Sequence, residues 1–272
     1  MQMSFNPQKC HRLHLGKNNT QHQYYLPKIY ATTENQSSIS YTLYLHNLEN
    51  VKDEKDLGVL VDRNLNFKKH ISQKISKANS MLFLIKHTFK HLDKNMFLLL
   101  YKSLVRPHLE YASCIWNPIT KEDSIRLERV QRRATKLLPE LSTLTYPERL
   151  QQLELPSLHY RRLRTDLIFL YNYVNQNILL NTKTHCKLCH NTEYMLTPIT
   201  AGTRGHPFRY RIHRLNTTRK RFLTGRTLHF WNNLSTQTVT ACSLNSFKTR
   251  LRSDSSMPSR FTFVEYGVPI IS

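Results

Sequence analysis

The most regular pattern of apolar and polar positions starts at residue 67. From there, apolar residues recur every three or four positions, which is the period of one helical face. The intervening positions carry several lysines, so this first predicted helix has an apolar face and a basic face. Its apolar positions are Ile71, Ile75, Ala78, Leu82 and Ile85.

The same period predicts four more helices before residue 175. They cover Met96–Val105 with an end at Pro107, residues 121–138, a short stretch over Glu148–Leu153, and Ser157–Tyr173. A stretch of this length is expected to bury a helical core of its own.

Before residue 67, the apolar and polar positions follow the shorter, alternating period of β-strands. Short strands are predicted at Tyr24–Leu26 and Ile29–Tyr30, a loop over Thr33–Ser38, an alternating strand over Tyr41–Leu45, and one strand over Lys55–Asp62. The fold prediction is therefore mainly α, with a helical bundle after a small β-containing part. Its divisions are 1–66 (strands and loops), 67–175 (bundle), 176–200 (linker), 201–253 (small basic module) and 254–272 (tail).

Charge changes this picture from a plain helical bundle to a binding protein. The 272 residues include 40 Lys and Arg against 18 Asp and Glu, a formal net charge of +22. Such an excess predicts a polyanionic partner, RNA or DNA first. A basic protein without a specific partner is the alternative. A membrane-surface protein is disfavoured because the basic helices lack a bulky, aromatic-rich apolar face.

Other features predict the compartment. No run of 18 apolar residues predicts a membrane span, and the first residues do not have the basic-then-apolar pattern of a secretory signal. The five scattered cysteines do not suggest a disulfide framework. We therefore expect an intracellular protein, in the nucleus or cytoplasm and not secreted.

The clearest candidate binding element is the helix over residues 121–138. Leu127, Val130, Ala134 and Leu137 fall on one face, and cations occupy the rest of the cylinder. Guanidiniums match phosphate geometry, so this face is predicted to follow a nucleic-acid backbone. The alternative is a solvated surface, and Glu128 is expected to pair with Arg132 four residues later. The predicted contacts are Arg129, Arg132, Arg133 and Lys136.

A second basic helix follows with the predicted contacts Arg161, Arg162 and Arg164. They lie beside His159 and Tyr160, and an aromatic ring next to arginines can stack on an unpaired base. Tyr160 also lies in line with Leu163 and Leu167, however. We therefore expect Tyr160 in the core and the three arginines on a phosphate backbone.

A third basic segment lies beyond residue 200. Its cations are interleaved with Phe208, Tyr210 and two histidines, which suits a single-stranded or structured RNA. Residues 208–214 alternate like an edge strand with an arginine face, although a basic arm that folds only on binding is an alternative. The predicted contacts are Arg204, Arg209, Arg211, Arg214, Arg219, Lys220 and Arg221.

One cluster has metal-ligand spacing. Cys186 and Cys189 form a Cys-x-x-Cys pair, which can place two thiolates on one turn of a tetrahedral zinc site. His190, His206 or His213 would have to complete it, because no second cysteine pair is present. Chance occurrence is the favoured interpretation, so we expect no resident cofactor in this chain, with zinc as the minor alternative.

Several ordered segments resemble the region after the polymerase core in reverse transcriptases of non-LTR retrotransposons, the jockey- and CR1-like LINE elements. They include Lys55-Asp56-Leu57-Gly58-Val59, the segment Leu100–Tyr111, Trp116-Asn117-Pro118 and Phe230-Trp231-Asn232-Asn233-Leu234, with the two basic helices between them. The resemblance implies a palm remnant over residues 1–66, a thumb-like bundle over 67–175, and a C-terminal extension.

One departure from the family decides the expected activity. The family's polymerase holds two Mg²⁺ ions with aspartates that include an Asp-Asp pair, and this sequence has no Asp-Asp pair. By resemblance, that pair and the fingers and endonuclease domains would lie upstream. The chain alone is therefore predicted to be inactive as an RNA-directed DNA polymerase, and to bind template RNA and primer. A stand-alone nucleic-acid-binding protein from a domesticated element and an inert pseudogene product are the alternatives.

Overall fold

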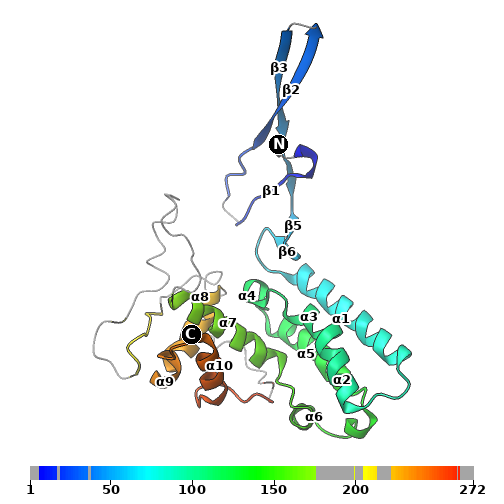
Figure 1. Ribbon diagram of the computed structural model, residues 1–272, viewed down its shortest axis with the longest axis vertical. Helices are drawn as coiled ribbons and strands as arrows, with labels where there is room; N and C mark the ends of the chain where they lie inside the picture. Colours follow the sequence, from blue (N-terminus) through cyan, green and yellow to red (C-terminus); the bar gives the residue numbers. More distant parts are fainter. Residues whose placement is uncertain are drawn as a thin grey trace. The chain divides into compact units, whose positions relative to one another are not determined.

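The computed structural model describes residues 6–16, 19–35, 38–175, 199, 205–212, 222–261 and 263. The described chain is mainly α-helical with three small two-stranded sheets, as the sequence predicts (Figure 1). It divides into two compact units, Met1–His70 and Ile71–Ser272, which are treated separately below.

The first unit contains the strands. β1 pairs with β4 in parallel, whereas β2 pairs with β3 and β5 pairs with β6 in antiparallel fashion. β2 continues to Asn35 and β3 begins at Ser38, so strands occupy the described residues of the loop predicted over Thr33–Ser38. The elements are the 3₁₀ turn η1 (Pro7–Lys9), β1 (His11–Leu13), β2 (Tyr25–Asn35), β3 (Ser38–Asn47), β4 (Glu49–Val51), β5 (Asp53–Asp56) and β6 (Val59–Asp62).

The single strand predicted over Lys55–Asp62 is wrong, because the segment folds back on itself. Leu57 and Gly58 form a two-residue turn with φ angles of 43° and 83°. Positive φ at both central positions is the geometry that matches the twist of a tight hairpin, and glycine adopts it readily. Leu57 adopts it as well and is 84% exposed. Because leucine is apolar and rare in such turns, its presence here led to the prediction of one continuous strand.

Asp62 links the last strand to the first helix. Its carboxylate accepts hydrogen bonds from the backbone N–H groups of Asn64, Asn66 and Phe67 at 3.0, 3.2 and 2.6 Å. These N–H groups lie just before the helix, where no helical carbonyl can accept from them, and the Asp62 carboxylate supplies the missing acceptor. Helix α1 then runs over Lys68–Thr88, which confirms the helix predicted from residue 67.

The second unit is helical. Most predicted helices are confirmed with ends shifted by a few residues, and the basic segment after residue 222 adds three helices. After α1 come α2 (Lys94–Leu100), the π-helical segment η2 (Tyr101–Val105), α3 (Arg106–Glu110), α4 (Ser113–Trp116), α5 (Lys121–Thr135), η3 (Pro139–Leu141), α6 (Tyr146–Gln152), α7 (Leu158–Val174), α8 (Leu223–Asn233), α9 (Thr236–Val239) and α10 (Leu244–Ser253).

The helix predicted to end at Pro107 instead continues to Glu110. A π-helical segment, Tyr101–Val105, precedes the proline, which then occupies the first turn of α3. Proline lacks an N–H group, and that position of a helix needs none. The wider π turn thus lets the chain pass a residue that would interrupt a regular α-helix.

The core of the bundle lies between α2, α3, α5 and the start of α7. Phe97 and Tyr101 stack with ring centroids 5.7 Å apart, and both are buried. The Tyr101 hydroxyl donates to Gln131 Oε1 at 2.7 Å, and Gln131 Nε2 donates to the Pro156 carbonyl at 3.0 Å. Buried polar atoms need such partners, so this chain of bonds fixes α5 between its neighbours.

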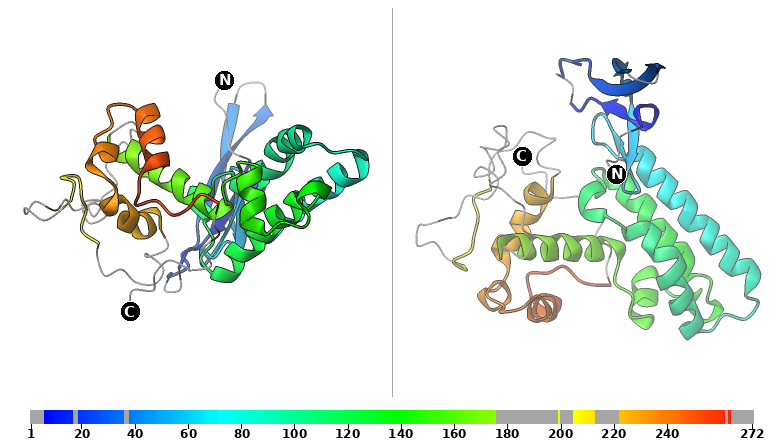
Figure 2. Two further views of the ribbon diagram at one scale, coloured as in Figure 1. Left: turned by 90° about the horizontal axis from the view of Figure 1, so that it is seen from below. Right: turned by 45° about the horizontal axis from the view of Figure 1, so that its top comes forward.

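A further core joins α7 to the C-terminal helices (Figure 2). Tyr171 stacks on Phe247 with ring centroids 4.2 Å apart, and Trp231 is fully buried beside them. Trp116 is also fully buried, so both tryptophans lie in the core. Helix α7 therefore packs on α3, α4 and α5 of the bundle and also on α8 and α10.

Candidate nucleic-acid interface

Helix α5 has the two faces that its sequence predicts. Leu127, Val130 and Ala134 are fully buried, whereas Arg129 and Arg133 are exposed. The helix ends at Thr135, so the exposed Lys136 lies in the turn that follows. These three cations can reach an external partner.

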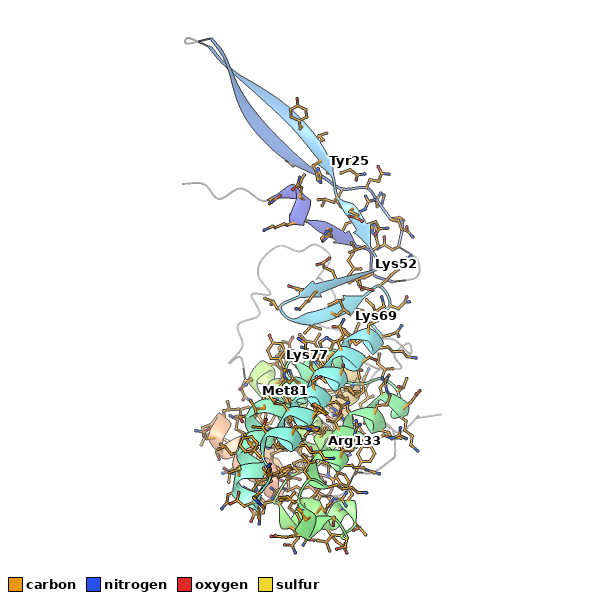
Figure 3. All side chains as sticks on the ribbon, turned by 90° about the vertical axis from the view of Figure 1, so that its right-hand side faces the viewer. Tyr25, Lys52, Lys69, Lys77, Met81 and Arg133 are labelled. Carbon is orange, nitrogen blue, oxygen red and sulfur yellow. The ribbon has the colours of Figure 1, made fainter. Side chains whose placement is uncertain are left out.

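Two side-chain contacts align α5 with α1. Arg126 Nη2 donates to Ser72 Oγ at 3.0 Å, and Arg133 Nη2 donates to Asn79 Oδ1 at 2.8 Å. Both contacts join residues 54 positions apart, so the two helices run in the same direction over this stretch. The helix surfaces repeat every seven residues, which lets the same contact recur two turns later. Figure 3 labels Arg133 and, on α1, Lys77 and Met81.

The neighbouring α1 surface is also basic. Helix α1 contains five lysines and no acidic residue, and Lys77 and Lys86 are exposed on it. Lys74 lies 5.8 Å from the centre of the Tyr111 ring. The pKa of His108 is lowered by burial and then by Lys74 and Lys77, which shows the sign of the local potential. We call Arg129, Arg133 and Lys136 the α1–α5 cationic surface.

Arg132 lies differently from its neighbours on α5. Its guanidinium is 4.9 Å from the Tyr146 ring centre and 5.6 Å from that of Phe263, so it contacts two aromatic faces. Such cation–π contacts fix the side chain against the protein. Arg132 is half-buried and belongs to the edge of the core rather than to the cationic surface.

The pairing of Glu128 with Arg132 is wrong. Glu128 is fully buried and points toward α6 and α7, where its Oε1 accepts from the Tyr146 hydroxyl at 2.5 Å and from Leu158 N at 3.2 Å. Burial raises the pKa of this carboxyl, and Arg162 acts in the opposite direction. The carboxylate therefore caps the start of α7 and is removed from surface chemistry.

Two of the three arginines predicted on α7 have partners inside the protein. Arg161 binds both carboxylate oxygens of Glu110, with Nη2 and Oε2 2.8 Å apart. Arg162 is only 2% exposed and donates to Ser124 Oγ at 3.2 Å. Its burial excludes Arg162 from a surface contact with a phosphate backbone, and helical periodicity alone could not show which arginine faced inward.

Arg164 lies in a pocket of about 140 Å³. The pocket combines the first turns of α7 with the end of α10 and the segment after it. It is lined by Pro156, Tyr160, Arg161, Arg164, Arg252 and Arg260. Sequence reasoning missed Arg252 and Arg260, because nothing in their local pattern places them beside residues some ninety positions earlier.

Tyr160 is in the core, as its place in the apolar stripe predicts. Its side chain is 2% exposed, and its hydroxyl has no hydrogen-bond partner among the described residues. Burial raises the pKa of this hydroxyl, while Arg260, Arg164 and Arg252 lower it. Three cations thus surround a neutral phenol that still has a proton to donate.

The basic segment beyond residue 200 is described only in part. Residues 205–212 lie beside α8. Of the strand predicted over 208–214, the structure describes residues 208–212, and among these Tyr210 makes a single bridge. The Asn232 side chain binds the backbone of Tyr210. Its Oδ1 accepts from Tyr210 N at 3.0 Å, and its Nδ2 donates to Tyr210 O at 2.7 Å. Arg211 is exposed. Arg209 Nε donates to the His206 carbonyl at 3.2 Å. The predicted contacts Arg204, Arg214, Arg219, Lys220 and Arg221 lie outside the described residues.

The weak zinc candidate also falls mostly outside the described residues, which do not include Cys186, Cys189 or His190. His206 is described and is 2% exposed, with its Nε2 2.9 Å from the Trp231 carbonyl oxygen. One of its ring nitrogens therefore already has a structural partner. Within the described part of the chain, no three His, Cys, Asp or Glu side chains come together as metal ligands.

Two further findings bear on the class of protein. None of the helices in the described ranges combines the length and the apolarity that a membrane span requires. Comparison of the chain with protein-family models, with curated proteins and with solved structures gave no match.

Proposed function

We propose that this chain binds RNA and DNA through the α1–α5 cationic surface. The observation that carries the proposal is that Arg129, Arg133 and Lys136 are exposed next to a helix with five lysines and no carboxylate. The Arg126–Ser72 and Arg133–Asn79 contacts hold the two helices in register. Fixed cations on one surface neutralise successive phosphates and release their counterions.

This surface favours contact with the backbone over recognition of bases. Its exposed members are lysines and arginines, which bind phosphates of any sequence. The rings of Tyr146 and Phe263, beside α5, are engaged by Arg132. We therefore expect affinity that depends on salt and on length, with little dependence on sequence.

The resemblance extends the proposal to a place in a larger enzyme. We propose that the helical unit acts as the thumb-like grip on template and primer of a non-LTR retrotransposon reverse transcriptase. The sequence has no Asp-Asp pair of the kind that holds Mg²⁺ in the family's polymerase. The isolated chain is then expected not to incorporate nucleotides, and templated synthesis by pure protein would contradict this.

The test is a fluorescence anisotropy titration of an RNA hairpin and a DNA duplex at several salt concentrations. Log affinity should fall linearly with log salt, with a slope of about 0.9 for each neutralised phosphate of the duplex. The variant Arg129→Gln, Arg133→Gln, Lys136→Gln should bind more weakly and show a smaller slope.

A control variant that loses the same number of charges elsewhere distinguishes binding by this particular surface from a general effect of net charge. Lys90→Gln, Lys94→Gln and Lys102→Gln also remove three exposed cations, around α2 rather than α5. This control should retain most of the affinity. Equal losses in the two triple variants, or no binding at low salt by folded wild-type protein, would reject the α1–α5 cationic surface as the binding site.

A further inference from the structure

The pocket between α7 and α10 is a second concentration of positive charge, and its walls are positioned by backbone contacts. Ser157, the cap of α7, donates its N–H to the Arg260 carbonyl at 2.8 Å. This bond holds the segment after α10 against the start of α7. Phe263 then packs edge-on against His159, with ring centroids 6.2 Å apart. The segment that carries Arg260 is therefore fixed at two points.

The charge in this pocket is poorly balanced. Four guanidiniums line it, and the carboxylate of Glu110 is engaged by Arg161. In the described part of the chain, no ion pair joins a carboxylate to Arg164, Arg252 or Arg260. Holding like charges together in a half-enclosed space is costly, and a bound anion would offset that cost.

Tyr160 adds a directional donor to this charge. Its side chain is 98% buried, since 2% is exposed, and its hydroxyl finds no acceptor among the described residues. A buried donor without an acceptor costs about 1–3 kcal/mol, so native proteins usually satisfy it. The arginines cannot do so, because a guanidinium has no acceptor atom. An anion with several oxygens would satisfy both the phenol and the cations.

We propose that the pocket formed by Tyr160, Arg164, Arg252 and Arg260 binds the dianionic phosphate of a phosphomonoester. The volume of about 140 Å³ suits one such group rather than a length of chain. A carboxylate has two oxygens and one charge, whereas a phosphomonoester has three terminal oxygens and close to two charges at neutral pH. The inference does not depend on the α1–α5 cationic surface. The phosphate is either the end of a nucleic-acid strand or part of a small molecule.

The test measures phenyl phosphate binding to the full chain by isothermal titration calorimetry, beside diphenyl phosphate, which has one charge. The monoester should bind and the diester should bind much more weakly. Monoester affinity should also fall below about pH 6, where its second proton returns while the arginines stay charged. Equal affinity for the two esters, or no binding of the monoester by folded protein, would overturn the proposal.

Variants locate the site. Arg260→Gln should weaken phenyl phosphate binding by about tenfold or more, and Tyr160→Phe by about threefold, since a guanidinium adds an ion pair to its hydrogen bond and an uncharged phenol does not. Lys102→Gln removes one exposed charge elsewhere and should bind as the wild type does. Unchanged binding by folded Arg260→Gln protein would place the anion outside this pocket and reject the proposal.

Competition then identifies the source of the phosphate. A 5′-phosphorylated oligonucleotide and its 5′-hydroxyl counterpart are titrated against bound phenyl phosphate. Displacement by the phosphorylated strand alone assigns the pocket to strand ends. Displacement by neither strand, with phenyl phosphate still bound, assigns it to a small phosphorylated molecule. Because this readout follows phenyl phosphate, the pocket proposal can fail while wild-type protein still binds nucleic acid through the α1–α5 cationic surface. The nucleic-acid proposal can likewise fail while phenyl phosphate still binds in the pocket.

Discussion

Arg226 on α8 forms a two-point ion pair with Asp166 on α7, deep in the helical unit. Arg226 Nε lies 2.8 Å from Asp166 Oδ2, and its Nη2 lies 3.0 Å from Oδ1 and 2.6 Å from the Cys114 carbonyl oxygen. Asn117 Nδ2 also donates to Asp166 Oδ2, at 3.0 Å. Arg226 belongs to the basic C-terminal segment by sequence, yet these contacts make it a structural residue that ties α8 to α7 and to α4.

Removing one partner of this pair should be costly. Asp166→Asn leaves the Arg226 charge buried without its counter-ion, which typically costs about 3–5 kcal/mol of unfolding free energy. Urea denaturation gives the value, with the exposed Glu140→Gln as a control expected to stay within about 0.5 kcal/mol of the wild type.

The double variant Asp166→Leu with Arg226→Met sharpens the same prediction. It removes both charges and should recover much of the loss, because apolar residues can replace a buried ion pair. A loss below about 1 kcal/mol in Asp166→Asn would show that the pair is open to solvent.

His159 should make the protein less stable in mild acid. Burial, and then the charge of Arg162, lowers the pKa of this imidazole to about 4. The unfolded chain takes up the proton near pH 6.5, so the folded state loses up to about 1.4 kcal/mol of relative stability for each unit between pH 6.5 and 4. Above pH 6.5 His159 is neutral in both the folded and the unfolded state, so none of this stability is lost there.

Urea denaturation from pH 7 to 4 measures that loss. His159→Gln should flatten the fall in unfolding free energy over this range, whereas the exposed His87→Gln should keep the wild-type curve. Parallel curves for the wild type and His159→Gln would mean that His159 takes up its proton at the same pH in the folded and unfolded states, which contradicts the prediction.

The hydroxyl of Tyr171 should contribute to the core that α7 shares with the C-terminal helices. It donates to the Ala241 carbonyl at 2.7 Å in a buried position. Tyr171→Phe keeps the ring stack on Phe247 and removes this bond, at a cost of about 1 kcal/mol. Tyr173→Phe, at a half-buried position of the same helix, should cost less. The order of the two urea midpoints checks the prediction, and a reversed order would contradict it.

The sequence predicted much of the helical architecture because burial imposes a local period. The stripe from Ile71 to Ile85 and the split of α5 into two faces could be seen directly, since each depends only on residues three or four positions apart. The π-helical passage before Pro107 could not, because it depends on how Tyr101 and its neighbours pack. The turn at Leu57–Gly58 was missed because its first central residue is one that rarely adopts positive φ.

The candidate site was less predictable, because pairing of charges is a property of the fold. Arg161 and Arg162 look alike in sequence to Arg164, yet Glu110 and Ser124 engage the first two from positions 51 and 38 residues away. Arg252 and Arg260 reach the pocket only because α10 packs on α7. A count of cations therefore located the basic helices correctly but overestimated how many of their side chains face outward.

Asp254 should anchor the end of α10 to the start of α9 in a charge-dependent way. Its Oδ2 accepts from Ser235 N at 3.0 Å and from Thr238 Oγ1 at 2.7 Å, and its Oδ1 accepts from Ser256 N at 3.0 Å. Burial acts against the charge, but these bonds outweigh it and lower the pKa of the carboxyl well below its usual range.

The stability from Asp254 is present above about pH 4, the unfolded pKa, and is lost as the pH falls further toward the folded value. Asp254→Asn should therefore lower the unfolding free energy at pH 7 by about 1–2 kcal/mol, the cost of losing a helix cap, and the difference from wild type should shrink below pH 4. Urea titrations of both proteins at pH 7 and pH 3 test this. A difference that stays constant between the two pH values would show that shape, rather than the charge of Asp254, holds α9 and α10 together.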